Sequence, residues 1–340
     1  MSRVGIRDVA AEAGVSVTTV SHVMNEAPNA QVRAETRERV LAAAARLGYK
    51  PNRMARSLRT RQTRTIALIS DTIATTPYAG QMILGAQRAA QDKGFTVVLF
   101  NTGEDPEVEK RELKAALDYQ VDGVIYATMY HRVISVPKQL DGTPVVLLDA
   151  ESPDSDAPSV VPDEATGGRT ATEELTSQGH RRIGFINNID NVPATGGRLQ
   201  GYQDALAAAG VEYDAGLVVN DVSETWGGYR AARALLASSD RPTAIFAYND
   251  RMAMGAYRAA AEAGLRIPDD LSIVGFDDQQ LITRGLYPEL SSVALPHFDM
   301  GFWAGETLAQ LLDDPESEVT TPRPLLMACP LVRRWSVAPV

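Results

Sequence analysis

Residues 6–24 read IRDVAAEAGVSVTTVSHVM, and their pattern predicts the fold of the N-terminal part of the chain. Its first apolar residues recur at helical spacing: Ile6, Val9, Ala10 and Ala13. Gly14 suits the left-handed conformation that closes a helix, and Ser16 stands where a second helix, expected over 17–24, needs an N-cap oxygen. Two short helices joined by a glycine-containing turn predict a helix-turn-helix.

The residues that follow add a supporting helix and a strong charge asymmetry. A third helix is expected over 34–47, ended by Gly48 and Pro51. Residues 1–64 contain 12 Lys and Arg and five Asp and Glu, a formal charge of +7, so the rest of a chain of net charge −10 carries −17. A basic head on an acidic body favours binding of a polyanion such as nucleic acid. A solvated basic face without a partner is the alternative.

The sequence lacks features that several classes of protein require. The 340 residues fit about two domains with room for a small third. No apolar run approaches the ~18 residues of a membrane span, and no signal-peptide core is present, so we expect a cytoplasmic protein without membrane contact. Cys329 is the single cysteine and the four histidines are scattered, which disfavours a metal site. Phosphate-loop, nucleophile-elbow and HExxH motifs are absent, so we expect no catalytic residue and no cofactor.

The body of the chain alternates apolar runs with helical stretches. Eight runs are rich in β-formers: 65–70, 95–100, 122–128, 144–149, 182–187, 243–249, 271–278 and 291–296. Six helices are expected between them: 80–93, 107–119, 165–178, 198–209, 228–237 and 251–263. This alternation predicts doubly wound parallel sheets. A polar run at 152–162 marks a crossing between two lobes, and ligands of such sheets bind beyond the carboxyl ends of the strands.

The head resembles that of the lac/gal repressor (LacI) family. The matching residues are Ile6-Arg7-Asp8-Val9-Ala10, Ala13-Gly14-Val15-Ser16, Thr19-Val20-Ser21-His22-Val23, Asn25, Thr36-Arg37, Val40, Leu47-Gly48-Tyr49, Pro51-Asn52, Ala55 and Ser57-Leu58. The body matches at Gly179–Gly184, Pro242–Phe246, Asn249-Asp250, Leu271–Asp278 and Leu331–Arg334. The resemblance therefore covers the whole chain. Gly5 departs from it, because the family usually has a capping Thr there, and the stretch around 29–31 is slightly long.

The resemblance implies an α/β protein with a helix-turn-helix head and a two-lobed core like that of periplasmic binding proteins. We expect the head over 1–50, a hinge or linker over 51–63 and an effector-binding and dimerisation core over 64–340. We expect the N-lobe to comprise about 64–161 plus 293–323, and the C-lobe to comprise about 162–292 plus 324–340.

The resemblance also implies which residues contact DNA. The family's base readers fall on Val17, Thr18 and His22, where Val17 can contact a thymine methyl and His22 can donate to guanine. Phosphate contacts are expected from Ser16, Ser21, Asn25 and Asn52. Ala55 and Leu58 are expected to belong to a hinge helix that forms on DNA and enters the minor groove. Leu58 would be the wedge that bends the duplex. A buried linker leucine is the alternative for Leu58.

Seven residues are expected to contact a small effector between the lobes: Pro77, Tyr78, Asp149, Arg198, Asn249, Asp277 and Trp226. The Arg198 guanidinium can grip paired hydroxyls or a carboxylate. For Asp250 and Asp278, capping of the next helix is an equal alternative. Trp226 stands three residues after the family's aromatic position, now Ser223, and Leu295 replaces a common polar residue. Met129 and Tyr130 are expected at the mouth of the site.

Together these features predict a sequence-specific transcriptional repressor that acts as a homodimer on a near-palindromic operator. A carbohydrate effector is favoured, and a nucleoside or purine on the same scaffold is the alternative. Two other classes share parts of the pattern. A solute-binding protein would share the body but not the basic head, and a sugar-active enzyme could use Asp149 and Asp277 as an acid pair.

Overall fold

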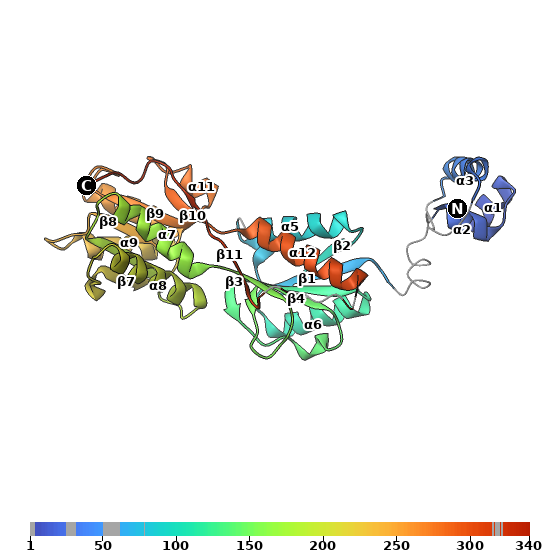
Figure 1. Ribbon diagram of the computed structural model, residues 1–340, viewed down its shortest axis with the longest axis horizontal. Coiled ribbons are helices and arrows are strands. Elements are labelled where there is room, and N and C mark those ends of the chain that lie inside the picture. The colour runs from blue at the N-terminus through green and yellow to red at the C-terminus, as the bar shows by residue number, and fades with distance from the viewer. Residues whose placement is uncertain are drawn as a thin grey trace. The chain divides into compact units, whose positions relative to one another are not determined.

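A computed structural model describes residues 4–24, 32–49, 62–77, 79–314, 316, 320 and 322–340. The chain divides into two compact units, Met1–Thr63 and Arg64–Val340 (Figure 1). The first unit is the head, and the second is the core that contains both lobes. No helix of the described residues is long and apolar enough to cross a membrane.

The head contains the three expected helices, α1 (Ile6–Ala13), α2 (Val17–Met24) and α3 (Ala34–Leu47). Their apolar faces form one small core: Val9, Ala10, Ala13, Val20, Val23, Val40, Ala43 and Ala44. Gly14 adopts the predicted left-handed conformation, with φ of 63°. Ser16 caps α2, since its Oγ accepts a 3.1 Å hydrogen bond from the Thr19 N–H. Gly5 has no capping side chain, but its N–H donates to the Asp8 carboxylate at 2.8 Å, so α1 retains one interaction of a capping box.

The core contains two six-stranded sheets with the same strand arrangement. The first has the order β11-β5-β4-β3-β1-β2: Leu325–Met327, Ser159–Pro162, Val145–Glu151, Gly123–Val133, Thr65–Ser70 and Thr96–Asn101. The second has the order β12-β10-β9-β8-β6-β7: Leu331–Val332, Ser291–Ala294, Ser272–Asp277, Ala244–Ala247, Ile183–Asn188 and Val218–Asp221. All pairs are parallel except β10 with β12. The predicted fold of two parallel-sheet lobes is confirmed.

Helices cover both faces of each sheet (Figure 1). The first lobe has α5 (Gly80–Asp92), α6 (Pro106–Asp118) and α12 (His297–Asp313), and the second has α7 (Glu164–Ser177), α8 (Pro193–Ala208), α9 (Thr225–Leu236), α10 (Asp250–Glu262) and the short α11 (Gln280–Thr283). In β1, Ile66 and Leu68 pack in the cluster that contains α5 and α12. Ala67 and Ile69 pack in the cluster on the α6 side. This alternation within one buried strand explains its continuous apolar sequence.

The crossings between the lobes lie slightly later than the expected lobe boundaries. The run at 152–162 is not all loop, because Ser159–Pro162 forms the buried strand β5 of the first sheet. The chain returns after β10, which keeps residues 293 and 294 in the second sheet. It crosses again after β11, whose residues 325–327 pair with β5, so the boundary expected at 323 is too early. Strands β5 and β11 were not recognised in the sequence, because β5 lies within a polar run and β11 has only three residues.

Close packing of α7 against α8 positions one functional side chain. A Cβ on Gly168 of α7 would come within 2.5 Å of the Arg198 carbonyl oxygen on α8. Gly201 of α8 faces the Ala165 carbonyl oxygen of α7 just as closely. Because both positions lack a side chain, the two backbones approach directly. The Arg198 guanidinium can therefore reach Glu164, the first residue of α7.

Candidate effector site and DNA-binding surface

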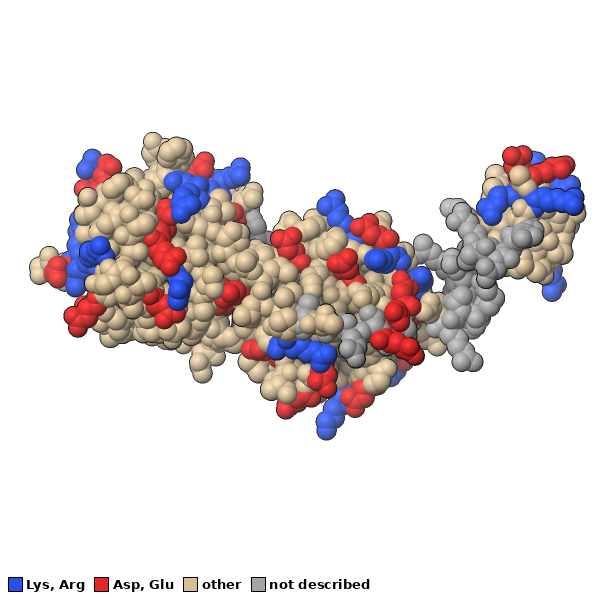
Figure 2. Space-filling model, viewed as in Figure 1, with Lys and Arg blue, Asp and Glu red and all other residues tan. Residues whose placement is uncertain are grey.

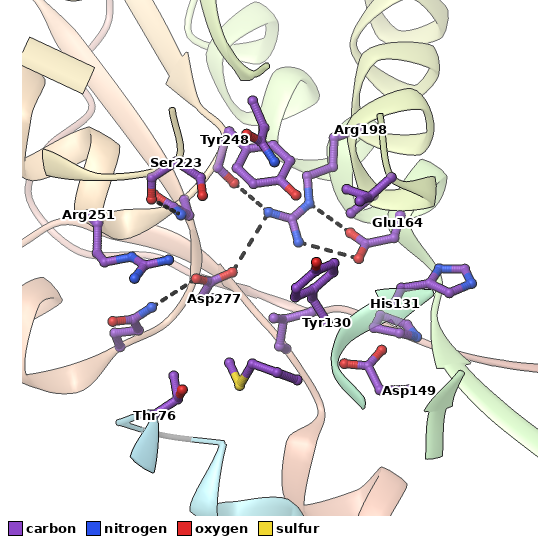
Figure 3. Close-up of a pocket in the computed structure, with 18 of the residues that line it drawn as sticks. Thr76, Tyr130, His131, Asp149, Glu164, Arg198, Ser223, Tyr248, Arg251 and Asp277 are labelled. Atoms are coloured by element: carbon purple, nitrogen blue, oxygen red, sulfur yellow. Dashed lines mark hydrogen bonds and ion pairs between the residues drawn. The ribbon is translucent and has the colours of Figure 1, made fainter. Parts of the chain in front are cut away.

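A cavity of about 340 Å³ lies between the two lobes of the core (Figure 3). It is lined by residues that follow or end the central strands of both sheets, where parallel sheets bind ligands. A register shift between β3 and β4, from Ala127 to Arg132, coincides with the residues of β3 that reach the cavity, Met129 to His131. The expected mouth residues Met129 and Tyr130 line it, as does Leu295.

The structure brings five of the seven predicted effector residues together around this cavity: Pro77, Asp149, Arg198, Asn249 and Asp277. Tyr78 lies outside the described residues. Trp226 does not line the cavity. Its side chain is 54% exposed at the start of α9, with the Arg230 guanidinium 4.1 Å from the ring centroid. The three-residue offset from the family's aromatic position explains this correction, because Ser223 lines the cavity instead.

Arg198 is the most extensively bonded side chain of the cavity, and it is only 3% exposed. Its Nε and Nη2 donate to the two Glu164 carboxylate oxygens at 2.7 and 3.3 Å, and its Nη1 donates to the Tyr248 carbonyl oxygen at 2.5 Å. Nη1 also lies 3.7 Å from Asp277 Oδ1 (Figure 3). A guanidinium has five N–H donors, so one donor on each terminal nitrogen remains for a ligand.

Asn249 and Asp277 also line the second-lobe side of the cavity. Asn249 caps α10, because its Oδ1 accepts from the Met252 N–H at 2.8 Å, while its Nδ2 donates to the Ser223 carbonyl oxygen at 3.1 Å. Capping therefore falls to Asn249 and not to Asp250. Asp277 has a positive φ of 100°, and its Oδ2 accepts from Gln279 Nε2 at 2.9 Å. Its Oδ1 remains available to a ligand beside Arg198.

The neighbouring residues Asp250 and Asp278 make contacts within the second lobe. Asp250 is fully buried, where it accepts hydrogen bonds from the Ser292 hydroxyl at 2.6 Å and the Gln279 N–H at 2.6 Å. Asp278 pairs with Arg334 at 2.7 Å. Neither residue lines the cavity, and neither caps the helix that follows it, so the capping alternative is wrong for both.

Asp149 stands on the first-lobe side of the cavity, at the end of the apolar part of β4. It is 2% exposed and has a positive φ of 57°. Its Oδ1 is buried and has no hydrogen-bond partner among the described residues. Burial, and then the nearby Glu164 carboxylate, raise the pKa of Asp149 well above its usual value, whereas Arg198 lowers it. A ligand that donates a hydrogen bond would satisfy this oxygen.

The sequence analysis missed further residues that line the cavity: His131, Glu164, Asp190, Arg251, Gln279 and His297. Glu164 was hidden in the expected start of a helix, with no local signal of its pairing to a residue 34 positions away. Burial, and then Arg198, lower the pKa of His297 to about 4, so its imidazole is neutral at pH 7. Neutral imidazoles can both donate and accept hydrogen bonds.

The pKa of Asp277 predicts a measurable dependence of stability on pH. Burial raises this pKa from 3.8 to about 6, against the opposing effect of Arg198. A raised carboxyl pKa means that the folded protein binds more protons than the unfolded chain. Protonation of Asp277 therefore contributes about 3 kcal/mol to the free energy of unfolding below pH 4. This contribution is lost as the pH rises through 6.

We expect Asp277→Asn to reduce the fall in melting temperature between pH 4 and 6.5. The fall should not vanish, because burial also raises the pKa of Asp250. Melting curves of the wild type, Asp277→Asn and the exposed control Asp240→Asn measure this. An unchanged pH profile in Asp277→Asn would contradict the assignment.

The head presents the predicted base readers on one surface of α2. Val17, Thr18 and His22 are exposed, with Val17 at 41%, whereas Val20 and Val23 of the same helix are buried. Ser16 is exposed and Ser21 is half-buried. Asn25, Asn52, Ala55 and Leu58 lie outside the described residues. Arg side chains are visible on the head in Figure 2, and acidic side chains are spread over the visible face of both lobes of the core.

Comparison with known proteins agrees with this architecture. A family model described as periplasmic binding proteins and sugar binding domain of the LacI family matches residues 63–334. A second, described as bacterial regulatory proteins of the lacI family, matches residues 5–52. The ribose operon repressor of Haemophilus influenzae is 35% identical over 316 residues, which cover 93% of this chain and 94% of that protein.

Two further similar proteins extend over nearly all of the chain. The HTH-type transcriptional repressor PurR of Pectobacterium carotovorum subsp. carotovorum is 35% identical over 336 residues, covering 98% of this chain and 96% of that protein. The crystal structure of the lac repressor dimer bound to operator and the anti-inducer ONPF has a TM-score of 0.80 and 28% identity, covering 99% of this chain and 100% of that chain.

A helix-turn-helix head and a two-lobed core with a polar cavity define a ligand-binding transcriptional regulator. This chain belongs to the LacI family, and it is a DNA-binding transcriptional repressor with a ligand-binding core. The family model describes regulatory proteins and the similar proteins are transcriptional repressors, so the sugar-active enzyme that the Asp149 and Asp277 pair allowed is set aside. A solute-binding protein is also set aside, because residues 5–52 match the regulatory head of the family.

Proposed function

We propose that this repressor binds a sugar between its lobes and that the sugar sets its affinity for operator DNA. One observation carries the proposal: Arg198 and Asp277 present adjacent donors and acceptors to the cavity, within 3.7 Å of each other. Vicinal hydroxyls donate and accept in the same paired way, so a guanidinium beside a carboxylate suits a sugar.

The aromatic rings near Arg198 favour a sugar over a purine. A purine base is held chiefly by stacking on aromatic faces. The Tyr248 and Phe276 rings already carry the Arg198 guanidinium, 4.3 and 3.7 Å from their centroids. Those faces are occupied by the protein itself, while the polar groups of the cavity remain open. The family model that matches the core also carries the description of a sugar binding domain.

On DNA, we propose that Val17, Thr18 and His22 read base edges in the major groove, while Ser16, Ser21, Asn25 and Asn52 fix the register on phosphates. Helix α2 presents the readers on its exposed side, opposite Val20 and Val23. A homodimer places two such helices on a near-palindromic site, as two-fold symmetry requires. Because it is a DNA-binding regulator, we also propose that the protein acts in the cytoplasm.

If residues 51–63 form a DNA-binding hinge, substitution of Leu58 should lower the affinity for operator DNA. If Ala55 and Leu58 enter the minor groove, Leu58→Ala removes the apolar wedge that bends the duplex. We expect specific operator affinity to fall about tenfold and nonspecific affinity to stay within about twofold, because the phosphate contacts are kept. Fluorescence anisotropy with operator and with scrambled DNA, at one salt concentration, measures both. Full operator affinity in the variant would contradict the wedge.

A thermal-shift screen tests the proposed effector class. The full chain is melted with monosaccharides, disaccharides, sugar phosphates, nucleosides and purine bases. A ligand that binds only the folded state stabilises it by RT ln(1 + [L]/Kd), so a specific rise in melting temperature identifies the binder. We expect a sugar to give that rise. A shift by a nucleoside or purine alone would contradict the proposal.

A further inference from the structure

We propose that Asp250 is a positioning residue of the effector site, which holds the turn after β9 so that Asp277 and Gln279 face the cavity. The inference rests on the proposed effector-binding function and adds a residue that does not itself line the cavity. Asp250 is the first residue of α10 and is fully buried, yet Asn249 is the residue that caps this helix. The buried carboxylate therefore serves neither the effector directly nor the helix that it begins.

The turn after β9 has a backbone conformation that needs support. Asp277 and Asp278 both have positive φ angles, 100° and 51°. Such angles are unfavourable for residues other than glycine, and they persist only where the surrounding contacts impose them. The contacts that impose this conformation therefore also determine where the Asp277 carboxylate points.

Asp250 supports this turn through both of its carboxylate oxygens. Its Oδ2 accepts a 2.6 Å hydrogen bond from the Gln279 N–H, and its Oδ1 accepts one of 2.6 Å from the Ser292 hydroxyl. Ser292 Oγ in turn accepts from the Asp278 N–H at 3.2 Å. Two successive N–H groups of the turn are thus bound to one buried carboxylate, the first through a hydroxyl and the second directly. Hydrogen bonds to an ionised acceptor are short and strong, which suits this role.

Strands β9 and β10 leave room for the Asp250 carboxylate at one point. A Cβ on Gly275 of β9 would lie 2.3 Å from Asp250 Oδ1, so a larger residue there would displace the carboxylate. Gly275 pairs with Ser292 in the register of β9 and β10, which brings the buried Ser292 hydroxyl to the same place. The glycine, the serine and the aspartate therefore form one arrangement, built from three segments of the second lobe.

The supported turn presents two polar side chains to the cavity in a fixed relation. Gln279 Nε2 donates to Asp277 Oδ2 at 2.9 Å, which leaves Asp277 Oδ1 beside the Arg198 guanidinium, 3.7 Å from Nη1 (Figure 3). Loss of Asp250 frees the Gln279 backbone and so the Asp277 carboxylate. The Arg334 guanidinium still holds the Asp278 carboxylate at 2.7 Å, so the turn stays attached to the lobe. We therefore expect loss of orientation without loss of the fold.

Hydrogen exchange of the full-length chain without ligand tests the support of the turn directly. In Asp250→Ala, amide exchange in peptides that cover residues 277–283 should be about tenfold or more faster than in the wild type. Asp250→Asn keeps the size of the side chain and an oxygen for the Gln279 N–H, so its exchange should stay close to that of the wild type. Unchanged exchange of the turn in folded Asp250→Ala overturns the inference. If that variant does not fold, Ser292→Ala decides in the same way, because it removes the acceptor of the Asp278 N–H.

Isothermal titration with D-ribose, D-glucose, D-galactose and cellobiose tests the consequence for binding. A sugar that binds the wild type should bind Asp250→Ala about tenfold or more weakly and Asp250→Asn within about threefold. Val274→Ala, at a buried position of β9, is the matched control: it lowers the melting temperature by leaving a cavity, but its sugar affinity is that of the wild type.

Two results separate this inference from the proposed function. Wild-type affinity in Asp250→Ala, or an equal loss in Val274→Ala, overturns the positioning role and leaves the proposed function standing. A wild-type chain that binds none of the four sugars contradicts the proposed function, and the exchange experiment then still confirms or overturns the support of the turn by Asp250.

Discussion

We expect Arg198→Ala to weaken effector binding strongly while the head still binds operator DNA. The variant removes the two guanidinium donors that remain for a ligand and leaves Asp277 without its nearest cation. Hydrogen bonds to charged groups contribute about 1.5–3 kcal/mol each, so the loss of two weakens effector binding about 100-fold or more. Titration of the effector into the variant measures this directly.

We also expect Arg198→Ala to destabilise the core, and this loss of stability must be distinguished from the loss of effector binding. Glu164 is 6% exposed, and Arg198 donates to both of its carboxylate oxygens. Removing one partner of a buried ion pair costs about 3–5 kcal/mol, which lowers the melting temperature of a core of this size by about 10 °C.

The double variant Arg198→Ala/Glu164→Gln removes the unpaired charge. It recovers most of the melting temperature but not the effector response. Arg169→Ala, which breaks an exposed pair with Asp204, changes neither property. If the double variant regained effector binding, the assignment of Arg198 as a ligand contact would be wrong.

We expect the combined variant V17A/T18A/H22A to reduce operator binding nearly to the level of random DNA. The three side chains are exposed on α2, whereas the helix is held by Val20 and Val23 and capped by Ser16. Loss of specific base contacts costs about 1–3 kcal/mol for each good contact, so we expect a fall of about 100-fold or more in operator affinity. Nonspecific affinity depends on phosphate contacts and is retained.

An operator selected from random DNA by the wild-type chain provides the probe for this test, and scrambled DNA of the same length provides the reference. Leu41→Ala is the control within the head, because Leu41 is 46% exposed and lies on α3, a different helix from the readers. The ratio of operator to scrambled affinity falls in the triple variant and is unchanged in the control. A triple variant that keeps the wild-type ratio would place sequence reading elsewhere in the chain.

Much of this architecture was predictable because its signals are local. Gly14 at a left-handed position and Ser16 at a helix start fix the helix-turn-helix without reference to the rest of the chain. Continuous apolar runs such as 65–70 predicted central strands for the same reason. The strands β5, β7, β11 and β12 were not predicted. Three of them, β7, β11 and β12, are short edge strands, and β5 lies inside its sheet but within a polar run of the sequence.

The cavity was predictable only in part, since its chemistry arises from pairs that are distant in sequence. Arg198 was identified through the family resemblance, but its partner Glu164 was not. The pairing depends on how closely α7 approaches α8, which no local pattern reports. Trp226 was misplaced because it lies on α9, three residues beyond Ser223, which precedes the helix and lines the cavity. The unpartnered oxygen of Asp149 is a property of the assembled lobes alone.

The most direct test of the account is the operator affinity of the full chain with and without the sugar that binds its core. Effector and operator act on one conformational equilibrium in this account, so saturating sugar changes operator affinity by about 5- to 150-fold, and saturating operator changes sugar affinity by the same factor. Fluorescence anisotropy gives the first factor and titration of the sugar into the operator complex gives the second. Equal operator affinity with and without saturating sugar would contradict the coupling between the two sites.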